Sequence, residues 1–85
     1  MKIKLIGIQP LYEENGAPKV GGNVYGLVLD GKTKGLIGYE SQKFYFGKTN
    51  LHDFKLDDIC IVDYEMYEFK GEWKGYPKDL IKITK

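Results

Sequence analysis

The dominant pattern in this chain is the alternation of apolar and polar side chains that is typical of β-strands. It recurs over residues 2–8, 23–29, 36–46, 59–69 and 80–84. Clusters of glycine, proline, asparagine and aspartate separate these runs and favour turns. No segment has the periodicity of a long amphipathic helix. The pattern predicts an all-β chain of five strands.

The connections refine this prediction. Pro10 is expected to end or bend the first strand, and Asp30-Gly31 is a strong signal for a tight hairpin. Gly38 suggests a bulge inside the third strand. Residues 50–57 fit one helical turn, with Asn50 as its cap. Five strands with one helical turn before the fourth fit a small barrel of the oligonucleotide-binding (OB) type, although an SH3-like barrel or an open β-sandwich has similar ingredients.

Length and cysteine content limit the class of protein. The 85 residues make one domain, residues 1–85, with a core just large enough to fold without disulfides. A single cysteine, Cys60, excludes an internal disulfide and suits a reducing compartment. We recognise no secretory leader, and the apolar run at residues 1–8 is too short to span a bilayer. We therefore expect a cytoplasmic protein.

The charge is small in total but unevenly distributed. All 13 basic residues are lysine, and the net charge is +1. Residues 1–48 carry +3, residues 49–69 carry −5 and residues 70–85 carry +3. Without arginine the chain lacks the bidentate fork that reads guanine in duplex DNA, whereas lysine still attracts phosphate. We expect the two basic segments to share one side of the fold and the acidic segment to face away.

Motifs that suggest catalysis fail on physical grounds. Residues 26–33 match the phosphate-loop pattern GxxxxGKT, but their centre is strand-like and no helix follows. His52 and Cys60 are too few for a zinc site, so we expect a solvated histidine and a buried thiol. Asp63 and Glu65 share a strand face, yet so small a domain has little room for a cleft. The sequence thus predicts no enzyme, metal or cofactor.

The only tryptophan, Trp73, lies between two glycines at the expected tip of a hairpin, residues 69–76. Leaving a large aromatic ring in solvent forgoes roughly 1.5–3 kcal/mol of burial. A stacked nucleic-acid base, a protein partner or a neighbouring loop are the alternatives for covering it. The first of these is worth about 1–3 kcal/mol per base.

Aromatic residues and lysines alternate through most of the chain. Phe44 and Phe46 are expected to face the core, with Tyr45 opposite them. Aromatic rings interleaved with lysine on a small barrel are typical of proteins that bind single strands without sequence preference. The predicted contact residues are Lys19, Tyr25, Leu27, Tyr39, Lys43, Tyr45, Lys48, Lys70, Trp73 and Lys74.

Three segments resemble the filamentous-phage gene V family of dimeric single-stranded-DNA-binding proteins with an OB barrel. They are GNVYGL at residues 22–27, FKGEWKG at residues 69–75 and LIKI at residues 80–83. The resemblance implies that Tyr25 and Leu27 contact DNA and that Trp73 lies on a binding loop. That family has arginines in its first long loop, where this chain offers only Lys19.

The sequence therefore predicts a cytoplasmic homodimer that coats single-stranded DNA during processes such as replication, with RNA as an open alternative. We expect no membrane contact. The rival prediction is a phage- or plasmid-borne module that inhibits a host protein through the Trp73 loop and the acidic strand.

Overall fold

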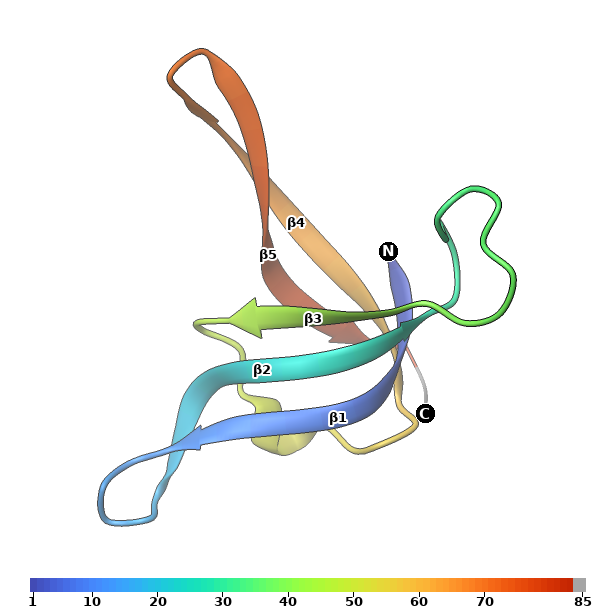
Figure 1. Cartoon of the computed structure of the whole chain (residues 1–85). Helices are drawn as coiled ribbons and strands as arrows, with labels where there is room; N and C mark the ends of the chain where they lie inside the picture. The colour runs from blue at the N-terminus through green and yellow to red at the C-terminus, as the bar shows by residue number, and fades with distance from the viewer. Residues whose placement is uncertain (84–85) are drawn as a thin grey trace.

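The protein is a single antiparallel sheet of five strands. The computed structural model describes residues 1–83. Its elements are β1 (Lys2–Tyr12), β2 (Pro18–Val28), β3 (Ser41–Phe46), the 3-10 turn η1 (Leu51–Asp53), β4 (Ile59–Phe69) and β5 (Glu72–Lys82). The strands lie in the order β3-β2-β1-β4-β5 (Figure 1). The all-β prediction with one short helical turn is confirmed.

Alternation within the strands builds the core. Phe44 and Phe46 of β3 are buried, whereas Tyr45 between them is 58% exposed, as predicted. Cys60 is fully buried, and this burial raises the pKa of its thiol to about 11. The cluster comprises Ile3, Leu5, Val24, Phe44, Phe46, Leu51, Cys60, Val62 and Leu80.

The barrel itself is not confirmed. The sheet curves so that its two edge strands, β3 and β5, border the same cavity. Within residues 1–83, however, no backbone ladder joins these two strands. The result is an open sheet with a seam between β3 and β5.

Two predicted details of the connections are confirmed. The side chain of Asn50 accepts a hydrogen bond from the backbone N–H of His52 and caps η1. Pro10 bends β1 but does not end it, since the pairing with β2 shifts register between Pro10 and Leu11 and the strand continues to Tyr12. Leu51 of η1 is buried, so this turn closes one end of the core.

The connection between β2 and β3 differs from the predicted hairpin. Residues 29–40 form a loop, at the start of which the Asp30 carboxylate accepts a hydrogen bond from the Lys2 N–H at 2.8 Å. Gly38 lies in this loop and makes no bulge in a strand. No helix follows Lys32-Thr33, which agrees with the rejection of a phosphate loop. The last strand begins at Glu72, earlier than expected, and Thr84 of the predicted run lies outside the described residues.

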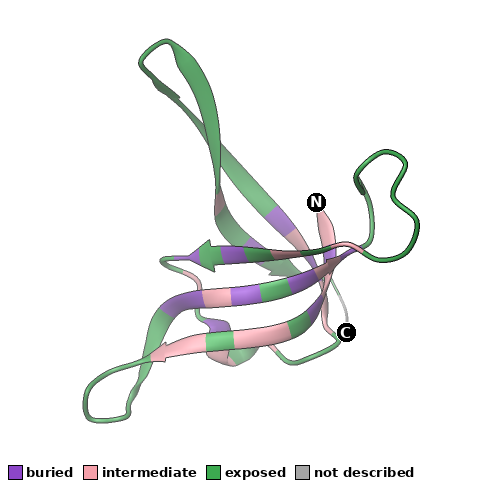
Figure 2. Ribbon diagram, viewed as in Figure 1, coloured by how far each residue is buried: buried purple, intermediate pink, exposed green. Residues whose placement is uncertain are grey.

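The β4–β5 hairpin extends far beyond the body of the sheet (Figure 1). β4 pairs with β1 only over Ile59–Ile61, so the rest of the hairpin has no strand on its other side. Lys70 and Gly71, both with positive φ, form its two-residue turn, which matches the favoured geometry of tight hairpins. We call residues 64–76 the β4–β5 arm. Figure 2 shows that the arm is almost entirely exposed.

Candidate nucleic-acid interface

Strands β1, β2 and β3 present a continuous outward surface, which we call the outer face. Strand pairing arranges its side chains in rows that run across the three strands. One row is Gly7, Tyr25 and Lys43, and the next is Gln9, Asn23 and Tyr45. The structure therefore brings together three of the predicted contact residues, Tyr25, Lys43 and Tyr45.

Tyr25 is held in place by its two row neighbours. Gly7 has no side chain, and the Tyr25 ring covers it: a β-carbon built on Gly7 would lie 3.0 Å from Cδ2 of Tyr25. On the other side, Nζ of Lys43 lies 6.0 Å from the centre of the Tyr25 ring. An exposed aromatic ring beside a lysine supplies a stacking platform and a contact for phosphate.

The second row adds hydrogen-bonding groups. Asn23 pairs across the strands with Tyr45, and its Nδ2 donates a hydrogen bond to Oε1 of Gln9 at 3.2 Å. Gly7, Gln9 and Asn23 were not among the predicted contact residues. Gly7 and Gln9 belong to none of the quoted segments, and although Asn23 lies within GNVYGL, only the register between β1 and β2 places it beside Gln9.

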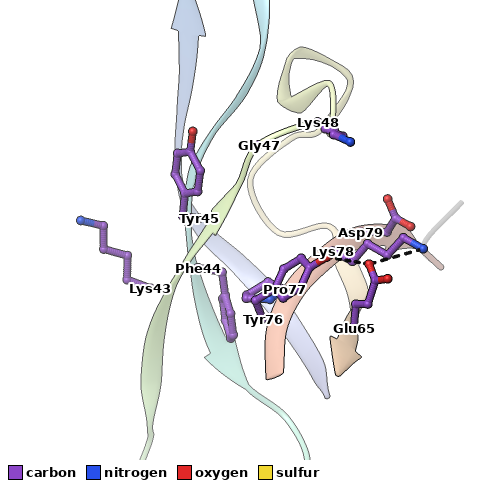
Figure 3. A pocket seen from close by; sticks show the side chains of 10 residues that line it. All are labelled: Lys43, Phe44, Tyr45, Gly47, Lys48, Glu65, Tyr76, Pro77, Lys78 and Asp79. Carbon is purple, nitrogen blue, oxygen red and sulfur yellow. Dashed lines mark hydrogen bonds and ion pairs between the residues drawn. The ribbon is translucent and has the colours of Figure 1, made fainter. Parts of the chain in front are cut away.

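Leu27 and Lys48 lie at the margins of the outer face. Leu27 is half-buried and pairs with Lys4 and Ser41 in a third row. Lys48 follows β3 and lines the seam together with Tyr45 (Figure 3). Both residues thus extend the surface that begins at Tyr25.

Two predicted contact residues stand apart. Lys19 lies at the start of β2 and lines a hollow together with two acidic residues, Glu13 and Glu14. Tyr39 is 81% exposed in the loop 29–40, with Nζ of Lys32 at 6.0 Å from its ring centre. Neither side chain belongs to the rows of the outer face.

Trp73 lies on the β4–β5 arm and is 68% exposed, so burial under a neighbouring loop is excluded. Strand register places Trp73 opposite Glu68, whereas Lys74 lies on the other side of the hairpin, opposite Tyr67. Lys70 and Lys74 instead approach the ring of Phe69, at 5.4 and 5.3 Å. The predicted group of Trp73 with two lysines is therefore divided between the two faces of the arm.

The expectation that the acidic segment faces away from the lysines is wrong. Glu65, which belongs to the acidic segment 49–69, lines the seam together with Lys43 and Lys48. The seam brings them together because β4 pairs with β5, and β5 borders the same cavity as β3. Oε2 of Glu65 accepts a hydrogen bond from the hydroxyl of Tyr76 at 2.7 Å and lies 3.8 Å from Nζ of Lys78.

The residues considered for catalysis in the sequence make contacts typical of structural residues. Nε2 of His52 lies 2.9 Å from the backbone oxygen of Leu11, and its ring packs edge-on against Tyr12 at 4.9 Å. His52 is therefore half-buried, and the expectation of a solvated histidine is wrong. Among residues 1–83, no three histidine, cysteine or acidic side chains gather in a way that could hold a metal ion.

Comparison with protein-family models, curated proteins and solved structures finds no match to this chain. The resemblance to the gene V family consequently rests on the three quoted segments and stays a prediction. Over the described part of the chain, no helix has the length and apolar character needed to cross a membrane.

Proposed function

We propose that this protein binds single-stranded DNA without sequence preference and coats or protects it. One observation carries the proposal. Tyr25 and Tyr45 are exposed on neighbouring rows of one sheet face, with Lys43 next to Tyr25 in its row. Stacking on an aromatic platform tolerates every base and contributes about 1–3 kcal/mol per base. In OB folds the surface of the second and third strands binds oligonucleotides.

The hairpin turns extend this surface. OB folds also use the loops between strands 1 and 2 and between strands 4 and 5. Here these loops follow Tyr12 and Phe69; in Figure 1 the β1–β2 hairpin reaches the lower left and the β4–β5 hairpin rises to the top. Trp73, near the turn between β4 and β5, offers the DNA one more ring for stacking, and Lys70 in that turn offers a positive charge.

Charge sets the strength of binding. The contacts to phosphate come from lysines, which act as point charges, because the chain has no arginine. Glu65 of β4 and Asp79 of β5 oppose phosphates on their side of the seam. Affinity is therefore moderate and depends on stacking as well as on charge. RNA offers the same bases and phosphates, so it is a second substrate to be compared with DNA.

The proposed biological unit is a cytoplasmic homodimer. The β4–β5 arm has apolar side chains on both faces: Tyr64, Met66 and Trp73 on one, and Tyr67, Phe69 and Tyr76 on the other. A two-stranded hairpin is only marginally stable in water by itself. Pairing of two arms covers part of this surface and leaves the rest for the nucleic acid. Sedimentation equilibrium measures the resulting mass.

A pair of lysine variants tests the binding proposal. Lys43→Gln removes a charge from the outer face, whereas Lys34→Gln removes the same charge from the exposed loop 29–40. The affinity for a labelled oligo-dT of about 12 nucleotides, measured by fluorescence anisotropy, is expected to fall for Lys43→Gln and to stay at the wild-type value for Lys34→Gln. Equal affinities of both variants contradict a role for the outer face.

A second candidate function is inhibition of another protein, as a phage- or plasmid-borne interaction module. It is favoured by the exposed aromatic residues on both faces of the arm, because aromatic side chains are enriched in protein interfaces. Acidic residues of the same hairpin, Glu65 and Glu68, would then contact basic groups of the partner. The two functions differ in one readout, since only DNA binding makes the affinity for oligo-dT depend on Tyr25 and Tyr45.

A further inference from the structure

The seam between β3 and β5 is a hollow next to the outer face. It encloses a cavity of about 590 Å³, within the range of roughly 300–1,000 Å³ that small-molecule sites occupy. β3 contributes Phe44 and Tyr45, and β5 contributes Tyr76 and Pro77. Because β3 and β5 are the edge strands of the sheet, no strand covers the cavity within the described residues.

The lining separates apolar from charged groups. In Figure 3 the ring of Phe44 points towards Tyr76 and Pro77, while Lys43 extends away from β5. Lys48 lies at the end of the cavity that follows β3, and no ion pair with a described residue occupies its ammonium group. The cavity thus has an apolar slot beside a free positive charge.

Tyr76 is fixed on its side of the slot. Its hydroxyl donates a hydrogen bond to Glu65 at 2.7 Å, and its ring contacts that of Tyr67 at 5.7 Å between centres. The hydrogen bond to Glu65 raises the pKa of the Tyr76 hydroxyl, which stays protonated at neutral pH. A ring held on both sides is a preorganised stacking surface.

Strand β3 connects the seam to the outer face. Lys43 and Tyr45 point outwards from β3 and border the seam, whereas Phe44 lies buried beneath it in the core. A single-stranded DNA molecule that runs across β2 and β3 therefore reaches the edge of β3, where the seam opens. We infer that the seam binds one nucleotide of that strand, with its base stacked on Tyr76 beside Pro77 and its phosphate on Lys48. This inference rests on the proposed function.

The acidic groups of the seam define the orientation of the nucleotide. Asp79 lies on β5, and Glu65 is engaged with Tyr76 and with Lys78. Both carboxylates repel a phosphate, whereas an uncharged base can lie against them. The phosphate therefore belongs at the β3 end of the seam, beside Lys48, and the base belongs at the β5 end.

A variant that removes the aromatic ring of the seam tests the inference. Tyr76→Ala deletes this stacking surface and, because Tyr76 is exposed, should leave the fold intact. The loss of one stacked base predicts a roughly fivefold or larger drop in affinity for the 12-nucleotide oligo-dT. Affinity for a thymidine dinucleotide, which the outer face alone accommodates, stays unchanged. Lys48→Gln, with Lys34→Gln as its control, is the second variant and lowers affinity for the longer strand only.

The NMR chemical shifts of the backbone amides of the wild-type protein, recorded with and without oligo-dT, show which of the two surfaces the DNA contacts. The inference predicts that oligo-dT moves the amides of Tyr25 and Tyr45 and also those of Gly47, Lys48 and Lys78. Shifts on the outer face with none in the seam overturn the inference but leave the proposed function intact. The absence of shifts on both surfaces overturns both. Wild-type affinity of Tyr76→Ala and Lys48→Gln for the longer strand likewise contradicts the seam site.

Discussion

The ring of Tyr25 lies on the backbone of Gly7, so close that a β-carbon on Gly7 would approach Cδ2, Cβ and Cγ of Tyr25 to between 3.0 and 3.4 Å. The Tyr25 side chain thereby covers Gly7, and its exposed part offers a surface on which a base can stack. Gly7→Ala is expected to push this ring off the sheet and to weaken oligo-dT binding by about 1 kcal/mol or more, while the melting temperature changes little. Anisotropy and thermal denaturation measure the two effects.

Gly26→Ala is the matched control for this substitution. Gly26 is close to Gly7 in the sheet, but its β-carbon would point into the core and lie 2.6 Å from Cδ1 and 2.9 Å from Cβ of Ile3. Overpacking of this kind costs about 1–3 kcal/mol of stability. Gly26→Ala should lower the melting temperature. A Gly7→Ala protein that binds oligo-dT like the wild type would show that the position of the Tyr25 ring is irrelevant to binding.

Trp73→Ala tests the contribution of the arm. Because Trp73 is exposed, its removal should leave the melting temperature nearly unchanged, in contrast to the roughly 3–5 kcal/mol that a buried tryptophan contributes. The affinity for oligo-dT should fall by about 1–3 kcal/mol. Unchanged affinity would assign Trp73 to a protein contact, and unfolding of the variant would mean that the ring belongs to the core.

The β2–β3 connection should respond to acid. Hydrogen bonds from Thr33, together with that from Gln42, lower the pKa of Glu40 from 4.5 to about 2. A lowered pKa means that the carboxylate stabilises the loop at pH values above 4.5 and that this contribution disappears as the pH falls towards 2. The amide resonance of Thr33 should titrate with a midpoint near 2. A midpoint at 4.5 would mean that the hydrogen bonds do not persist in solution.

Salt separates the charge contribution to binding from stacking. With about three to five phosphates neutralised, the logarithm of the association constant should fall against the logarithm of salt concentration with a slope of about −2 to −3.5. The stacking on Tyr25, Tyr45 and Trp73 should persist, so binding remains measurable at about 0.5 M salt. Titrations of oligo-dT at increasing salt measure this slope. A complete loss of binding at moderate salt would contradict the stacking contribution.

The sequence predicts the strands well because each residue's direction follows from local alternation. Phe44, Tyr45 and Phe46 illustrate this: each faces the side that alternation assigns to it. Asn50 is likewise a local cap. The predicted tight hairpin at Asp30-Gly31 is absent, and Asp30 instead accepts a hydrogen bond from Lys2, a contact remote in sequence that no local pattern predicts.

The candidate site is less predictable than the fold. Tyr25 and Lys43 meet only through the pairing of β2 with β3, and Gly7 enters through the pairing of β1 with β2. No local pattern encodes either register. Trp73 and Lys74 are adjacent in sequence and therefore point to opposite faces of the hairpin. The prediction grouped them because they are neighbours in the sequence, and it did not account for this alternation.

The central claim is that the outer face binds single-stranded DNA, and its most direct test is the anisotropy of a labelled oligo-dT at low salt. Wild-type protein should bind oligo-dT, and it should bind mixed sequences of equal length with similar affinity. The Tyr25→Ala/Tyr45→Ala double variant should fold normally, because both rings lie on the exposed face, and should lose most of this binding. Failure of the wild-type protein to bind any single strand at low salt would contradict the account and favour the protein-partner alternative.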